Sequence, residues 1–434
     1  MTKTKKPSTR APSGRNAPEA KRTRREIGAG RAGLLESWPG LVQASPGDPL
    51  FKEWAQALQE AGDPRGELVT LSRKFHETPT TELKGQLSEL IAKNPKWTRD
   101  TAPFYEATFR DGFISGLRCV AFDTDFELDD EDKLEDVYEP KLLILRDPIS
   151  SRLERLSLGT LIYAEGNHGC WGRQKIALRN LLSMPRPHLR TLEFDCWMMT
   201  EPLNVETGEA RLPHRLRGCM HEAEITYGDL SQLWKIAPQL EHLVIAQGLA
   251  GKLQGSLGDI DAPRLRTLCL GFTPIVATQL EALSAAKLPN LRWLELRLVS
   301  DDIGVANERL NAQLLKAALN NSTLRQLHHI ALLGDIGQEA GLGREDGELV
   351  ISTFLESPLL GQVKSLDLGG IQAGDSAWQK LIAFASRLSL KELRLTRNIP
   401  PVIAGGLEAA FPVIWRSPEA MEPTDPTDPN QERM

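Results

Sequence analysis

A short pattern of leucines, spaced Leu-x-x-Leu-x-Leu, occupies residues 265–270 of this chain and returns 26 residues later at 291–296. The stretch between the two copies, 274–288, has apolar residues at helical spacing. Each copy therefore predicts a short strand followed by a turn and a helix. Because one such unit cannot bury its leucines alone, tandem copies predict a stack in which each unit covers the next.

The same spacing recurs from residue 153 to residue 395. Successive copies from Leu240 onward begin 25, 26, 36, 36 and 27 residues apart, which fits repeats of about 20–29 residues with two units lengthened by insertions. The copies begin at Leu153, Leu189, Leu240, Leu265, Leu291, Leu327, Val363 and Leu390, with a first rung at Ile114, Leu117 and Cys119 in a strand with a glycine turn, and a degenerate copy at Met220, Ala223 and Ile225. Helices are predicted between the strands, for example over 305–319 and 378–388, with a last one over 404–411.

This spacing resembles that of the leucine-rich-repeat family. The resemblance implies an α/β solenoid with a parallel sheet on its concave side and helices on its convex side. One departure is that the family usually places an asparagine three residues after the last strand leucine, and only Asn398 occupies that position here. The repeat class and the curvature are therefore left open.

Ahead of the repeats, the pattern of apolar residues over 49–71 predicts two short helices around a sharp turn. Asp48 followed by Pro49 marks the start of the first helix, because an aspartate caps free N–H groups and proline tolerates the first turn. A third amphipathic helix is predicted over 81–93, where it ends before Asn94.

The turn between the first two helices has a recognisable sequence. Gly62 can adopt the left-handed conformation that ends a helix, and Arg65 is expected to pair with Glu67. The run 53–71 resembles the bacterial repeat-companion domain. The resemblance implies a small helical module ahead of repeat regions and does not indicate any activity. The matching residues are Trp54, Leu58, Gly62, Asp63, Pro64, Arg65, Gly66, Glu67 and Leu68.

The composition of the chain narrows its class. Hydrophobic residues make up 41% and charged residues 25% of its 434 residues, which fits a folded protein with a large core. No apolar run approaches the roughly 18–20 residues that span a bilayer, and the N-terminus lacks the apolar segment of a secretory signal. Five cysteines without a Cys-x-x-Cys pair indicate reduced thiols. We therefore expect a cytoplasmic bacterial protein without membrane association.

Charge is distributed unevenly around a net value of −6. Residues 1–33 have a balance of +8 and residues 123–139 a balance of −9. A basic end rich in Pro, Ser and Ala is typical of a disordered tail, with nonspecific attraction to phosphates as an alternative use. The predicted parts are a disordered basic tail at 1–30, a helical module at 31–100, the solenoid at 101–416 and a disordered acidic tail at 417–434.

The residues between the strand leucines are the candidate binding surface. Successive side chains of a strand point to opposite faces, so these residues should line the concave face in columns. Trp293 stands there beside Glu295 and Arg297, and Trp and Arg dominate binding hot spots. A solvated strand face without a partner is the alternative. The candidate residues are Glu193, Asp195, His242, Trp293, Glu295, Arg297, His329, Asp367, Glu392 and Arg394.

Metal, nucleotide and catalytic sites find little support in the sequence. The acidic run 123–139 lacks the ordered spacing of a calcium loop, and the glycine-rich segment 166–172 lacks the lysine that ends a P-loop. No motif of the GxSxG or HExxH kind occurs. Soft zinc ligands occur without the tight pairs of a zinc site, at His168, Cys170, Cys196, Cys219 and His221. We predict no cofactor, metal or catalytic residue.

Together these patterns predict a non-catalytic scaffold that binds another protein on its concave sheet. The alternative is a nucleic-acid-associated factor that uses the basic tail at 1–30. A third hypothesis is a hydrolase or ligase whose site no motif reveals.

Overall fold

The structure is a computed structural model that describes residues 38–97, 105–121, 143–163, 174–199, 214–215, 226–246, 254–270, 277–298, 310–334, 344–396 and 399–416. Both predicted tails, the acidic run 123–139, the degenerate copy at 220–225 and Asn398 lie outside these residues. The chain divides into two compact units, Met1–Leu90 with Arg110–Gly112, and Ile91–Phe109 with Phe113–Met434.

The first unit is helical, as the sequence predicts. Its helices are α2 (Trp38–Gln43), α3 (Pro49–Glu60), α4 (Arg65–Glu77) and α5 (Thr81–Lys93). Helix α3 begins at Pro49 because the Leu50 N–H donates to Asp48 Oδ1 at 2.9 Å. Gly62 closes the helix at φ +68°, and α3 packs against α4 with Phe51 and Leu68 fully buried.

Arg65 pairs with Asp63 rather than with Glu67. The guanidinium Nη2 lies 2.6 Å from Asp63 Oδ2, and Asp63 Oδ1 also accepts the backbone N–H of Arg65 at 3.0 Å. Residues two apart on a helix do not face each other, so Glu67 is badly placed for Arg65. The aspartate that caps the start of α4 therefore also holds its first cation.

The turn Arg110–Gly112 belongs to the first unit and packs on α4. Asp111 and Gly112 both have positive φ, 51° and 80°, which is the backbone of a tight hairpin turn. The Gly112 N–H donates to Ser72 Oγ at 3.0 Å, and the Gly47 N–H donates to Asp111 Oδ2 at 3.3 Å. A Cβ on Gly112 would lie 2.4 Å from a methyl carbon of Val69, so only glycine fits.

The second unit is built on one long sheet, which is parallel except at two strands, β1 at its start and β5 beside β4. Its order is β1-β2-β3-β4-β7-β9-β10-β11-β12-β13-β14, with β5 (His214–Arg215) antiparallel to β4, while β6 (Thr226–Asp229) and β8 (Gln254–Ser256) form a separate pair. The strands of the long sheet are β1 (Tyr105–Arg110), β2 (Phe113–Ala121), β3 (Arg155–Tyr163), β4 (Thr191–Met199), β7 (His242–Ala246), β9 (Thr267–Leu270), β10 (Trp293–Arg297), β11 (His329–Leu333), β12 (Ser365–Asp367), β13 (Glu392–Thr396) and β14 (Val413–Arg416).

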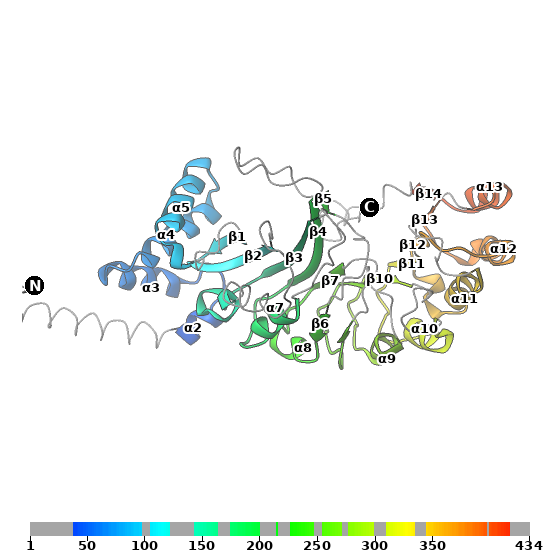
Figure 1. The fold of residues 1–434 in the computed structure, drawn as a ribbon, viewed down its shortest axis with the longest axis horizontal. Helices are drawn as coiled ribbons and strands as arrows, with labels where there is room; N and C mark the ends of the chain where they lie inside the picture. The colour runs from blue at the N-terminus through cyan, green and yellow to red at the C-terminus, as the bar shows by residue number, and fades with distance from the viewer. Residues whose placement is uncertain are drawn as a thin grey trace, which may run out of the picture. The chain divides into compact units, whose positions relative to one another are not determined.

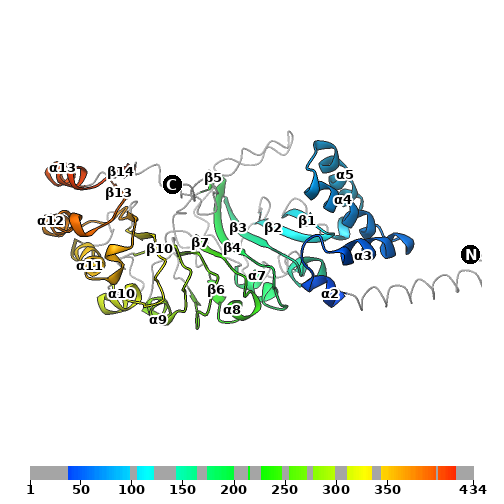
Figure 2. The same cartoon turned by 180° about the vertical axis from the view of Figure 1, so that it is seen from behind.

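Helices lie between successive strands along the outer side of the second unit, and the strands follow one another along the inner side (Figures 1 and 2). The α-helices are α7 (Gln174–Leu181), α8 (Leu233–Ile236), α9 (Ala277–Ala285), α10 (Ala312–Leu319), α11 (Arg344–Leu355), α12 (Asp375–Ala383) and α13 (Pro401–Ala410). Short 3₁₀ turns occupy Pro95–Trp97, Leu143–Arg146, Pro148–Ser150, Pro358–Gly361 and Ala385–Arg387. This is an α/β, solenoid-like arrangement.

The predicted leucine positions align across the sheet. The register pairs Leu294 with Leu268 on one side and with Ile330 on the other, and the alignment extends back to Leu117 of β2. All are buried, and each such side chain stabilises the fold by about 1.5–3 kcal/mol relative to an exposed one. In the described sheet β4 is hydrogen-bonded directly to β7.

Buried polar side chains link neighbouring rungs of the stack. The Asn321 amide donates to the carbonyls of Leu283 at 2.7 Å and Ala286 at 2.8 Å in the preceding rung. Arg186 is fully buried and lies three residues before Leu189, the first leucine of its copy. The equivalent position in later copies is occupied by Leu288 and Leu324. Such groups give carbonyls at the turns a side-chain hydrogen-bond donor.

Candidate functional site

The candidate residues lie on the inner face of the sheet, the face away from the helices, in register from strand to strand. The central column is Ser157, Glu193, Val244, Cys269, Glu295, Ala331, Asp367 and Arg394. The first column precedes it on each strand and contains Arg155, Thr191, His242, Thr267, Trp293, His329, Ser365 and Glu392. The columns predicted from strand alternation are confirmed.

Most of the central column is buried, whereas alternation alone predicts a solvated face. Glu193 and Glu295 are each 4% exposed and Asp367 is 2% exposed. Part of the cause is that larger side chains of the first column lie over smaller neighbours, since Trp293 packs on Val244 and Cys269. The middle of the inner face is therefore a second small core rather than an open surface.

The first column is a chain of polar and aromatic contacts that crosses neighbouring strands. His242 Nδ1 lies 3.0 Å from Thr267 Oγ1, and His329 Nδ1 lies 2.8 Å from Ser365 Oγ. The rings of Trp293 and His329 stack with centroids 3.4 Å apart and planes 16° apart. Trp293 is half-buried, and within the described residues its Nε1 has no hydrogen-bond partner. The stack fixes the indole at the rim of the central column.

Several charged candidate residues form ion pairs or hydrogen bonds with neighbours on the sheet. The exposed Arg155 donates from Nη2 to both oxygens of Glu193, at 3.1 and 3.3 Å, and Glu392 forms an ion pair with Arg394 on the same strand. Asp367 Oδ1 accepts the backbone N–H of Gly369 at 3.0 Å. Arg297 is buried, and the side chain of Asp195 lies outside the description although its backbone is in β4. These contacts join residues of the sheet to one another.

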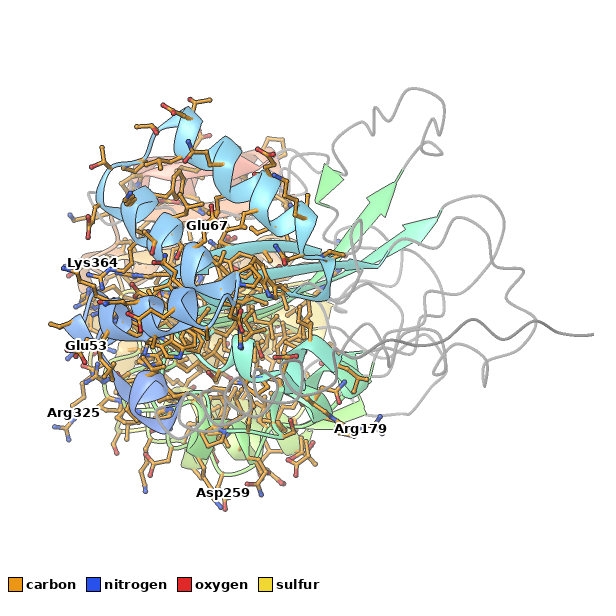
Figure 3. The ribbon with its side chains drawn as sticks, turned by 90° about the vertical axis from the view of Figure 1, so that its left-hand side faces the viewer. Glu53, Glu67, Arg179, Asp259, Arg325 and Lys364 are labelled. Atoms are coloured by element: carbon orange, nitrogen blue, oxygen red, sulfur yellow. The ribbon has the colours of Figure 1, made fainter. Side chains whose placement is uncertain are left out.

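Just before the first column, a row of basic residues follows the N-terminal ends of five successive strands. We call it the basic row: Arg266, Arg292, His328, Lys364 and Lys391, all exposed. Its backbone is continuous, because each residue's N–H donates to the carbonyl of the previous one at 2.7–2.9 Å. In Figure 3 Lys364 lies at the edge away from the heads of the strand arrows. Sequence reasoning missed this row, although each member directly follows the first apolar residue of its copy.

The basic row carries mostly unpaired positive charge. Glu241 lies 3.7 Å from Arg266 and 3.8 Å from Arg190, so the first member is partly neutralised. Within the described residues no carboxylate forms an ion pair with Arg292, Lys364 or Lys391. Burial, and then the charges of Lys364 and Arg292, lower the pKa of His328 below its ordinary 6.5.

The predicted absence of a metal site is not tested at its candidate residues. His168, Cys170, Cys219, His221 and the side chain of Cys196 lie outside the description. In the described part of the chain no group of three or more His, Cys, Asp and Glu residues could hold a metal ion. Over the same residues no helix has the length and apolar character to cross a bilayer.

Comparison with known proteins gives no family. No protein-family model matches the chain, and no curated protein does. Among solved structures, the chain is similar to a structural-genomics crystal structure of a Bacteroides fragilis protein, at 16% identity and a TM-score of 0.45, over 77% of this chain and 82% of that chain. A likeness of this degree gives no information on function.

Proposed function

We propose that the chain is a non-catalytic scaffold, a leucine-rich-repeat solenoid preceded by a repeat-companion module, that binds another protein in the bacterial cytoplasm. The observation that carries this proposal is the half-exposed Trp293 on the inner face, fixed by its stack on His329. A rigid aromatic side chain that needs no ordering on binding is typical of an interface anchor.

The accessible part of the candidate surface is narrower than the sequence suggests. His242, Trp293, Glu392 and Arg394 are half-buried and can be reached from solvent. Glu193, Glu295, Arg297, His329 and Asp367 are buried, and support the first group from below. The proposed contact surface is therefore the accessible part of the first column, with His242, Trp293 and Glu392, together with Arg394.

The proposal is tested by comparing the proteins that the wild-type chain and Trp293→Ala retain from the native cell. Val402→Ala, which truncates a side chain 87% exposed on α13, is the matched control for removing an apolar group. We expect Trp293→Ala to lose a specific partner that Val402→Ala retains, with thermal unfolding confirming that both variants are folded. Retention of every specific partner by Trp293→Ala would rule out the inner face.

A further inference from the structure

We propose that the basic row, Arg266, Arg292, His328, Lys364 and Lys391, docks an acidic, extended segment of another protein. The inference rests on the proposed scaffold function and names the chemistry of its partner. It concerns a surface outside the candidate residues, at the N-terminal edge of β9 to β13.

The geometry of the basic row suits a linear ligand. Neighbouring parallel strands lie about 4.8 Å apart, so the five members extend over roughly 19 Å in a nearly straight line. The hydrogen-bonded backbone that joins them fixes this spacing without any ordering on binding. In an extended peptide, alternate side chains on one face lie about 6.7 Å apart, so three or four carboxylates match the length of the row.

The charge of the basic row is available to a ligand. Arg292, Lys364 and Lys391 are exposed and have no ion-pair partner among the described residues, and Arg266 shares Glu241 with Arg190. Burial is the largest cause of the lowered pKa of His328, and the charges of Lys364 and Arg292 add to it, as expected for cations that no carboxylate compensates. A bound carboxylate would oppose that effect.

An acidic protein segment fits these observations better than a nucleic acid. Nucleic-acid-binding domains are usually strongly basic, with a pI above about 9. This chain has a net charge of −6 and a pI near 5.9, so it lacks the overall basic charge that is typical of a nucleic-acid-binding domain. Single-stranded nucleic acids also need open aromatic faces for base stacking, and His329 covers one face of Trp293, the aromatic residue that directly follows Arg292.

The test uses the full chain and a labelled peptide of alternating Glu and Ser residues, with an alternating Gln and Ser peptide as the neutral control. The row variant is Arg292→Gln, Lys364→Gln, Lys391→Gln. The matched control is Arg179→Gln, Lys235→Gln, Lys380→Gln, which removes the same charge from exposed positions on α7, α8 and α12. Arg179 lies well away from Lys364 in Figure 3.

Fluorescence anisotropy at low salt should show binding of the acidic peptide and not of the neutral one. Three lost charge contacts should weaken binding about tenfold in the row variant, and the matched control should stay within about twofold of wild type. The difference should shrink at high salt. Equal weakening by the two variants, or no binding of the acidic peptide, overturns the proposal.

Three further outcomes also overturn it. A single-stranded oligonucleotide that binds more tightly than the peptide, and in a row-dependent way, makes the ligand a nucleic acid. Row-dependent peptide binding that appears only after deletion of residues 417–434 assigns the basic row to the chain's own acidic end. If Trp293→Ala loses its protein partner while the row variant keeps it, the inference fails and the scaffold function stands.

Discussion

Arg186 is predicted to be the polar side chain on which the first rungs of the second unit depend most. It is fully buried, and its guanidinium donates to the carbonyls of Leu181 at 3.2 Å and Ser150 at 2.5 Å, and to that of Leu145. Burial lowers the pKa of Arg186 to about 10, so the charged form loses roughly 3 kcal/mol to desolvation. The bonds to three carbonyls offset that loss.

Arg186→Ala is expected to lower the free energy of unfolding by about 3–5 kcal/mol, because it removes the side-chain hydrogen bonds to three buried carbonyls and leaves a cavity beside them. Arg186→Met should lower the free energy of unfolding by a smaller amount, about 1–3 kcal/mol. Methionine keeps most of the volume and removes a buried charge that is costly to desolvate, and both effects offset part of the loss of hydrogen bonds. Arg186→Lys should resemble Met rather than wild type, because an ammonium cannot reach three carbonyls in the fork geometry.

Urea unfolding followed by far-ultraviolet circular dichroism measures these differences, with an unchanged dependence on urea as the check that the unfolded surface is the same. Asn180→Ala is the control. Asn180 is also fully buried on α7, but neither its Oδ1 nor its Nδ2 has a hydrogen-bond partner among the described residues, so little stability should be lost. A loss below about 1 kcal/mol for Arg186→Ala, or one no larger than for Asn180→Ala, would refute the reasoning.

Two further predictions follow from single residues. Gly112→Ala should destabilise the first unit by about 2–4 kcal/mol, because φ is +80° and the new Cβ would overlap Val69. The control is Gly85→Ala on α5, where the space around the Cβ is open, and it should stabilise the unit by about 0.5–1 kcal/mol. Thermal unfolding of both variants measures the difference. The pKa of His328 should lie below 6.5 in an NMR titration and rise in Arg292→Gln. Because the unfolded imidazole then binds more protons than the folded one, this group makes stability fall as pH drops through and below 6.5. A His328 pKa at or above 6.5, or one unmoved by Arg292→Gln, contradicts the close approach of these charges.

The alignment of the leucines across the sheet could be predicted from the sequence, because burial of one face of each strand fixes the pairing register between strands. A slip of one residue would turn Leu294 and Leu296 to the inner face and bring Glu295 into the helix-covered core. The start of α3 and the end of α5 were equally predictable, because Asp48 caps the first helix and Asn94 directly follows the second.

Features that depend on contacts between rungs could not be predicted. The burial of Glu295 reflects side chains on neighbouring strands, whose residues lie 26 and 36 positions away in the sequence. The choice of Asp63 rather than Glu67 by Arg65 follows from the cap geometry at the start of α4. The basic row is visible in the sequence as one residue per copy, and only the register shows that these residues form one line.

The first column and the basic row are adjacent in sequence on strands β9 to β13, and contacts made by the two surfaces should also differ in chemistry. Trp293 directly follows Arg292, and Ser365 directly follows Lys364. A contact centred on Trp293 depends on apolar groups that salt screens little, whereas a contact made by the basic row weakens as salt rises. Glu295 is buried in the central column, so its replacement should disturb the packing of the sheet rather than one contact surface alone. Salt dependence therefore assigns a partner to one surface or the other, and a mutation in the central column does not.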